Sequence, residues 1–213
     1  MGEGIPAGWD SIGTPRSKEN QILEPNRPAH FLVGLIDRAP NAVYEKEPER
    51  NEKVLARREM IRSCSEKVEE IGRELSEAFV ATYAKHGLII RHGLRFYIVG
   101  GRLEAKRLFE GSDLDCAFTT VDSEEDVHPK YGEEPKEITD KKREARRDFF
   151  YGPFKDIVRK YGFMTTDTTA EGETIEGPLL ESKEHGSSDE AFRERNLPAL
   201  LIFTLPAIQE GKD

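Results

Sequence analysis

The chain has only two cysteines, Cys64 and Cys116, among its 213 residues. Two cysteines cannot form the disulfide framework on which many small secreted domains depend. The five histidines show none of the spacings that are typical of metal ligands, so a zinc site is not expected.

Long apolar runs are also missing. The longest early run, residues 31–36, is far shorter than the roughly 20 residues that a membrane-spanning helix needs. The first 30 residues lack a basic start followed by an apolar stretch, which is the pattern of a secretory signal. We therefore expect a soluble, intracellular, cytoplasmic protein with no membrane partner.

Basic residues are fewer than acidic ones. Lys and Arg number 32 against 41 Asp and Glu, so the net charge is −9. Non-specific binding of nucleic acid relies on Lys and Arg that displace counterions from phosphates, which disfavours long nucleic acid as a partner. Any basic site must be local. The basic stretch 136–147 is typical of a solvated helix face, because acidic residues lie at pairing distance within it. A phosphate or RNA contact is the alternative.

The pattern along the chain predicts a tail followed by one domain. Residues 1–30 hold four Gly and four Pro without a hydrophobic period, and are predicted to be a flexible or draped tail. The domain is expected over 31–208, starting with a short strand or buried anchor at 31–36. Apolar residues recur at spacings of three, four and seven over about 49–86, which predicts one long helix or two broken pieces. Gly72 is the weakest point of that stretch.

The core of the domain is expected at about 95–205, where strand and helix patterns alternate. The fold class is therefore α/β (α+β), with a small mixed sheet and flanking helices. Residues 121–135 and 181–196 are polar and are predicted to be loops. A short helix is expected at about 102–109. The other predicted elements are strands at 95–99, 113–119, 162–168, 173–180 and 197–205, and helices at 136–150 and 154–161.

One local pattern indicates a site for a metal ion and a phosphate group. The strand 95–99 runs into Gly100-Gly101, and after eleven intervening residues Asp113-Leu114-Asp115 begins a second strand. Glycines after a strand let backbone N–H groups approach a phosphate closely. Two aspartates at i and i+2 of a strand point to the same face, where they can share a divalent cation. Carboxylate oxygens suit Mg²⁺, which can neutralise charge on a triphosphate.

This pattern resembles the nucleotidyltransferase superfamily that includes DNA polymerase beta. The matching residues are Ile98-Val99-Gly100-Gly101 and Gly111-Ser112-Asp113-Leu114-Asp115-Cys116, within about 96–118. The resemblance implies transfer of a nucleoside monophosphate from an NTP, such as ATP, to an acceptor hydroxyl, with release of pyrophosphate. It implies a catalytic pair that binds Mg²⁺ or Mn²⁺, namely Asp113 and Asp115. It also implies nucleotide contacts from Gly100, Gly101, Ser112 and Lys106, with Arg102 and Arg107 as alternatives to the lysine.

The third carboxylate of that superfamily lies on a later strand beside the aspartate pair. In the polymerase-beta branch it follows a hairpin, of which 166–168 and 172–174 are reminiscent. The corresponding strand would be 200–205, which ends at Pro206 and contains no carboxylate. Asp167 and Glu176 are the candidates if the strands are arranged differently.

Two functions therefore stand side by side. The first is a Mg²⁺-dependent nucleotidyltransferase whose acceptor is an RNA end, a protein or a small molecule. The second is a catalytically degenerate module of the same fold that binds a nucleotide or a protein partner. A glycosyltransferase-type Asp-x-Asp site would also hold a nucleotide through a metal, but it leaves Gly100-Gly101 unexplained.

Overall fold

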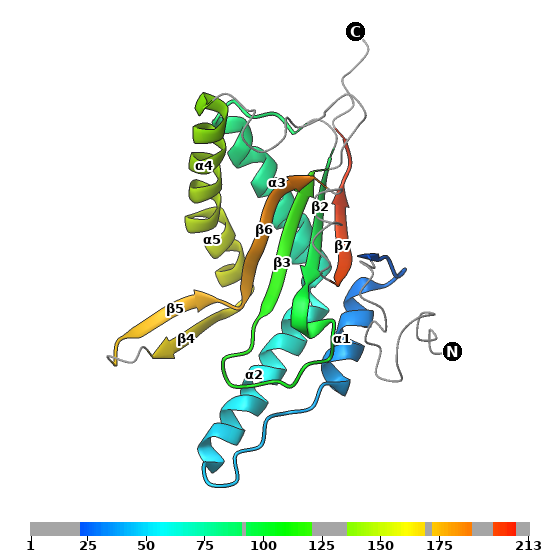
Figure 1. Ribbon diagram of the computed structural model, residues 1–213, viewed down its shortest axis with the longest axis vertical. Helices are drawn as coiled ribbons and strands as arrows, with labels where there is room; N and C mark the ends of the chain where they lie inside the picture. Colours follow the sequence, from blue (N-terminus) through cyan, green and yellow to red (C-terminus); the bar gives the residue numbers. More distant parts are fainter. Residues whose placement is uncertain (1–21, 91–92, 121–135, 169–171, 189–197, 208–213) are drawn as a thin grey trace.

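The computed structural model describes residues 22–90, 93–120, 136–168, 172–188 and 198–207. These residues form a five-stranded mixed sheet, with helices packed against one of its faces, and a separate two-stranded hairpin (Figure 1). This confirms the predicted fold class. The strands of the sheet, in spatial order, are β1 (Ile22–Leu23), β7 (Ala199–Leu205), β2 (Leu94–Val99), β3 (Leu114–Thr120) and β6 (Leu180–Ser188).

The centre of the sheet is antiparallel and its two edges are parallel. Strand β2 pairs antiparallel with both β3 and β7, whereas β6 runs parallel to β3 and β1 runs parallel to β7. Leu114, Cys116 and Phe118 of β3 are fully buried in the main core, and the residues between them face the other side of the sheet. The alternation expected of this strand is therefore present.

The hairpin is formed by β4 (Met164–Thr168) and β5 (Thr174–Pro178), paired antiparallel. Strand β6 starts two residues after β5 ends, so the prediction of a polar loop over 181–196 is wrong for its first half. Residues 189–197 lie outside the described part, as does the predicted loop 121–135. Strand β6 is difficult to predict because its composition is polar and its intrinsic strand propensity is low. In the fold, pairing with β3 stabilises it.

The segment at 31–36 is a buried anchor, but it is helical rather than extended. Helix α1 (Pro28–Arg38) begins with a proline, whose missing N–H costs nothing in the first helical turn. Leu32, Leu35 and Ile36 are fully buried at the spacing of one helix face. The N-terminal part of the chain therefore belongs to the fold from Ile22 onward, while residues 1–21 are not described.

The stretch 49–86 is two helices, α2 (Pro48–Glu66) and α3 (Val68–Lys85), separated at Lys67. The expectation of one long helix is thus wrong, and the two-piece alternative is correct. The hydroxyl of Ser65 donates to the carbonyl of Ile61 at 2.8 Å, a contact that bends helices, and Lys67 departs from helical geometry. Gly72, expected as the weakest point, lies inside α3.

The core lies between the sheet and α3. Phe79 of α3 stacks on Phe118 of β3 with ring centroids 5.1 Å apart, and Phe149 closes the cluster from α4. Helices α4 (Lys136–Tyr151) and α5 (Pro153–Lys160) stand beside α3 and the edge strand β6 (Figure 1). Both were predicted, including the break at Gly152-Pro153. No helix among the described residues has the length and apolar character needed to cross a membrane.

Gly72 allows α3 to approach the sheet closely, and its replacement by alanine is expected to destabilise the protein. A Cβ atom there would lie 2.5 Å from Cδ1 of Phe96, which is fully buried and also packs against Phe118. We expect Gly72→Ala to lower the free energy of unfolding by about 1–3 kcal/mol in urea denaturation. The control is Gly34→Ala in α1, where the nearest atom is Nη1 at the end of the Arg38 side chain, 3.5 Å away, an ordinary van der Waals contact. That variant should gain about 0.5–1 kcal/mol. Equal effects at both glycines would contradict the packing argument.

Candidate metal and phosphate site

The two aspartates of the motif sit together where β3 begins. Leu114 between them is fully buried under the helices, so the strand alternation places Asp113 and Asp115 on the opposite face of the sheet. Both side chains are partly buried. Asp115 lies opposite Val99, the last residue of β2, so the pair stands beside the glycine turn that follows that strand.

A third carboxylate joins them from the neighbouring strand. The parallel register of β3 and β6 places Glu181 directly opposite Asp115. One oxygen from each of Asp113, Asp115 and Glu181 lies within 4.8 Å of the other two. Glu181 is exposed, whereas the two aspartates are more enclosed. Three carboxylates at one edge of the sheet form a compact set of hard oxygen donors.

Of the two candidates for a third carboxylate that were inferred from sequence, Glu176 does not take this place. Glu176 lies on the hairpin and forms an ion pair with Arg159 at 3.3 Å. Asp167 lies on β4, and its side chain is outside the described part of the structure. The strand that follows the hairpin is β6, which carries Glu181, whereas the strand expected in that place from sequence, 200–205, is β7.

A sequence signal for Glu181 was present but weak. The predicted strand 173–180 included Leu179 and Leu180, although β5 ends at Pro178 and Leu180 begins β6. Both leucines are fully buried. Glu181 then follows at an outward position, the same apolar–acidic step that Leu114 and Asp115 make on β3.

The donor set fits a small divalent cation. Mg²⁺ binds oxygen at about 2.0–2.1 Å in octahedral geometry, so two ligands on opposite sides are about 4.2 Å apart. Neighbouring ligands of such an ion are closer, at roughly 2.9 Å, so the carboxylate oxygens, which lie within 4.8 Å of one another, would have to turn inward to share one cation. Like charges at this separation repel one another, and a cation between them removes that cost. Asp113, Asp115 and Glu181 are therefore the residues that would hold Mg²⁺ or Mn²⁺.

The glycine turn supports this set from the side of β2. After Val99 the chain enters a 3₁₀ turn, η1 (Gly100–Arg102), and the longer helix expected at 102–109 does not form. Gly100 has φ of 78°, a conformation that favours glycine, and a Cβ there would lie 2.9 Å from Oδ2 of Asp115. Its N–H donates to the carbonyl of Pro198 at 3.2 Å. In this structure Gly100 thus leaves room for Asp115 while its own N–H is used within the fold.

Ser112 holds the turn that leads into Asp113. Its hydroxyl accepts the N–H of Phe109 at 2.8 Å, and its N–H donates to the carbonyl of Phe109 at 3.1 Å. The side chain is almost fully buried. These two bonds fix the approach of the chain to the carboxylate pair.

The basic residues near the turn differ in how they face the carboxylates. Burial lowers the pKa of Arg102, while the charges of Asp113 and Asp115 act in the opposite direction. Arg102 therefore lies within the field of the aspartate pair, and its guanidinium donates to the carbonyl of Lys106 at 3.1 Å. Lys106 itself is exposed and pairs with Glu104 at 2.5 Å. Arg107 is exposed as well.

The loop before Ser112 is held from α2 and the segment preceding it. Arg50 donates to Glu110 at 2.7 Å through Nε, and the hydroxyl of Tyr44 donates to the same carboxylate at 3.0 Å. The backbones of Ala42 and Leu108 are joined by a hydrogen bond of 2.8 Å. These contacts make the loop that carries Lys106 and Ser112 part of a fixed framework.

Comparison with protein-family models, curated proteins and solved structures finds no match.

Proposed function

We propose that the protein is a Mg²⁺-dependent nucleotidyltransferase that moves a nucleoside monophosphate from an NTP to a hydroxyl group. One observation carries the proposal: Asp113, Asp115 and Glu181 converge beside the glycine turn that follows β2. Three carboxylates next to a turn of this kind are the parts needed to hold a metal–triphosphate.

Each part of the site has a role in the reaction. When bound, the cation supplies Lewis-acid stabilisation of the charge that develops on the phosphates. The three carboxylates hold it. Arg102, within the field of the aspartates, lies where it offsets negative charge on the triphosphate, and the exposed Lys106 extends the positive surface on the same loop.

The transfer itself requires a hydroxyl oxygen, a phosphorus atom and a leaving group in line. The acceptor oxygen bonds to the α-phosphorus while the bond from that phosphorus to the bridging oxygen of the β-phosphate breaks. Pyrophosphate leaves with the bonding electrons. The hydroxyl proton passes to Glu181, the exposed carboxylate of the three, or to water.

The alternative of a degenerate module rested on the absence of a carboxylate from the strand 200–205. Glu181 on β6 removes that ground, since it stands beside Asp115 on a different strand. The enzyme therefore becomes the better-supported reading of the site.

The test is metal-dependent binding followed by turnover. Calorimetric titration of each NTP is carried out with Mg²⁺ and again with a chelator, and Mn²⁺ binding to the protein alone is followed by electron paramagnetic resonance. We expect Mn²⁺ to bind without nucleotide, at least one NTP to bind only with the metal, and pyrophosphate to be released when a cell extract supplies the acceptor. Failure of every NTP to bind in the presence of Mg²⁺ would contradict the proposal.

A further inference from the structure

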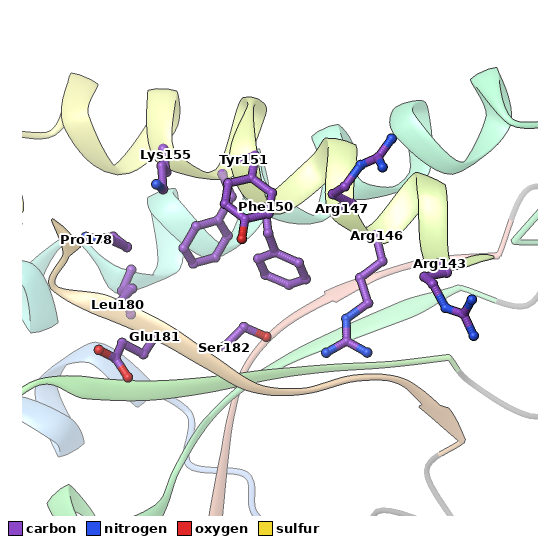
Figure 2. Close-up of a pocket in the computed structure, with 11 residues that line it drawn as sticks. Arg143, Arg146, Arg147, Phe150, Tyr151, Lys155, Pro178, Leu180, Glu181 and Ser182 are labelled. Atoms are coloured by element: carbon purple, nitrogen blue, oxygen red, sulfur yellow. The ribbon is translucent and has the colours of Figure 1, made fainter. Parts of the chain in front are cut away.

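A basic and aromatic groove lies next to the carboxylates, between α4–α5 and the start of β6 (Figure 2). It is open to solvent and has a volume of about 630 Å³, within the range of ligand sites. Six of its lining side chains determine its character: Arg143, Arg146, Arg147 and Lys155 are cationic, and Phe150 and Tyr151 are aromatic.

The groove concentrates positive charge in a protein whose net charge is −9. Arg143 and Arg147 have acidic neighbours on the same helix, Asp140 at 3.4 Å and Asp148 at 3.5 Å. Within the described residues, no ion pair involves Arg146 or Lys155. Figure 2 shows Arg146 extending from α4 toward Ser182 on β6. The basic stretch is therefore more than a self-compensated helix face, because part of its charge is directed into the groove.

The aromatic side chains suit flat, π-bearing ligands. Tyr151 is 74% exposed, an unusual exposure for a large side chain, and Nζ of Lys155 lies 5.3 Å from its ring centroid. Phe150 is partly buried and lines the same wall. Cations for phosphates alternating with aromatic rings for bases are the combination that binds single-stranded nucleic acid without sequence preference.

The length of the basic wall fits a strand rather than one anion. Arg143 and Tyr151 are eight residues apart on α4, which corresponds to roughly 12 Å along the helix, and Lys155 extends the wall onto α5 beyond the break at Gly152-Pro153. A wall of this length accommodates more than one phosphate of a strand. A single triphosphate would leave part of the wall unused.

Glu181 connects the groove with the carboxylate site, since it belongs to both. The strand order places the glycine turn at the end of β2, the aspartate pair on β3, and Glu181 with the groove at the β6 edge. In-line displacement needs the acceptor and the leaving group on opposite sides of the phosphorus. If pyrophosphate leaves on the side of the glycine turn, the groove lies on the acceptor side.

We propose that the groove binds the end of a single-stranded nucleic acid, and that the terminal sugar hydroxyl of this strand is the acceptor. The catalytic part rests on the proposed function, whereas strand binding does not. The terminal oxygen bonds to the α-phosphorus of the NTP, pyrophosphate departs with the bonding electrons, and the proton goes to Glu181 or water. The product is the strand extended by one nucleotide.

The test measures strand binding without metal and without NTP. Short labelled oligonucleotides of mixed sequence, one RNA and one DNA, are titrated with the full chain in chelator, and fluorescence anisotropy is recorded over a series of salt concentrations. The groove variant is Arg146→Gln with Lys155→Gln. Its matched control is Lys141→Gln with Arg159→Gln, which changes the charge equally on the same two helices at residues paired with Glu137 and Asp156.

The groove variant is expected to bind the strand at least tenfold more weakly and to reduce the slope of log affinity against log salt by about 1.4, which is roughly 0.7 for each lost phosphate contact. The control should bind nearly as the wild type does. Tyr151→Ala is expected to weaken binding roughly tenfold, whereas Tyr151→Phe, which keeps the ring, should not. Thermal unfolding of each variant checks that the fold is retained.

The outcomes separate this inference from the proposed function. Absence of strand binding, or equal weakening in groove and control variants, overturns the inference even if Mg²⁺–NTP binding is found. Displacement of the strand by ATP in chelator also overturns it, because the groove is then a nucleotide site. Strand binding without any Mg²⁺–NTP binding supports the groove as a nucleic-acid site but overturns the acceptor role. The acceptor role is also overturned if the nucleotide is transferred in extract to a protein, so that the labelled product resists nuclease. Binding of RNA alone, DNA alone or both supports the groove and identifies the strand.

Discussion

Glu181→Gln is expected to reduce metal-dependent transfer by about a hundredfold or more and to weaken Mn²⁺ binding to the protein alone. The substitution keeps the size of the side chain and removes one of three negative charges around the proposed cation. A metal ion supplies several kcal/mol of charge stabilisation, and each 1.4 kcal/mol corresponds to about a factor of ten in rate. Glu181 is exposed, so its change should leave the melting temperature close to that of the wild type.

Glu176→Gln is the matched control for this experiment. It makes the same chemical change on β5, where the carboxylate pairs with Arg159 away from the site. Asp113→Asn is the positive reference, since it removes a carboxylate from the same cluster. We expect Glu181→Gln to behave as Asp113→Asn does, and Glu176→Gln as the wild type does. If Glu176→Gln lost activity and Glu181→Gln kept it, the assignment of Glu181 as the third carboxylate would be contradicted.

The parts of the site that sequence predicted correctly are local ones. The shared face of Asp113 and Asp115 follows from the two-residue period of one strand, and the close approach that Gly100 allows follows from the residue type. Neither inference needs knowledge of which strands are neighbours. The strands at 95–99, 113–119 and 162–168 were predicted for the same reason, because apolar and β-branched residues dominate or alternate within them.

The parts that sequence did not predict depend on contacts between distant residues. Glu181 joins the cluster because β6 pairs with β3 across 66 positions of sequence, and its polar composition resembles that of a loop. Helix α1 was read as a strand or anchor because a short apolar run fits either structure until its neighbours are known. The break at Lys67 rather than Gly72 has a similar cause. Close packing of α3 on Phe96 requires a glycine at position 72, so Gly72 lies within the helix despite its low helix propensity.

Gly100→Ala is the second change with a large expected effect. Alanine at this position meets two obstacles, a φ of 78° and a Cβ atom 2.9 Å from Oδ2 of Asp115. The backbone strain costs roughly 1–2 kcal/mol. The clash pushes Asp115 out of line with Asp113 and Glu181, and a misplacement of about 1 Å at a catalytic group can cost about a hundredfold. We therefore expect weaker Mn²⁺ binding and a transfer rate reduced by about that factor. Calorimetry and pyrophosphate release measure the two effects.

The control for that experiment, Gly111→Ala, separates the cause from a general sensitivity of the loop. Gly111 precedes Ser112 in the same motif, its φ is not in the left-handed region, and no atom lies within 4 Å of where its Cβ would be. It should bind Mn²⁺ and turn over nearly as the wild type does. Alanine at Gly100 keeps the backbone N–H that donates to Pro198, so a loss of metal binding there reports the added Cβ and not a lost donor. Unchanged Mn²⁺ binding in Gly100→Ala would show that the glycine serves the phosphates rather than the position of Asp115.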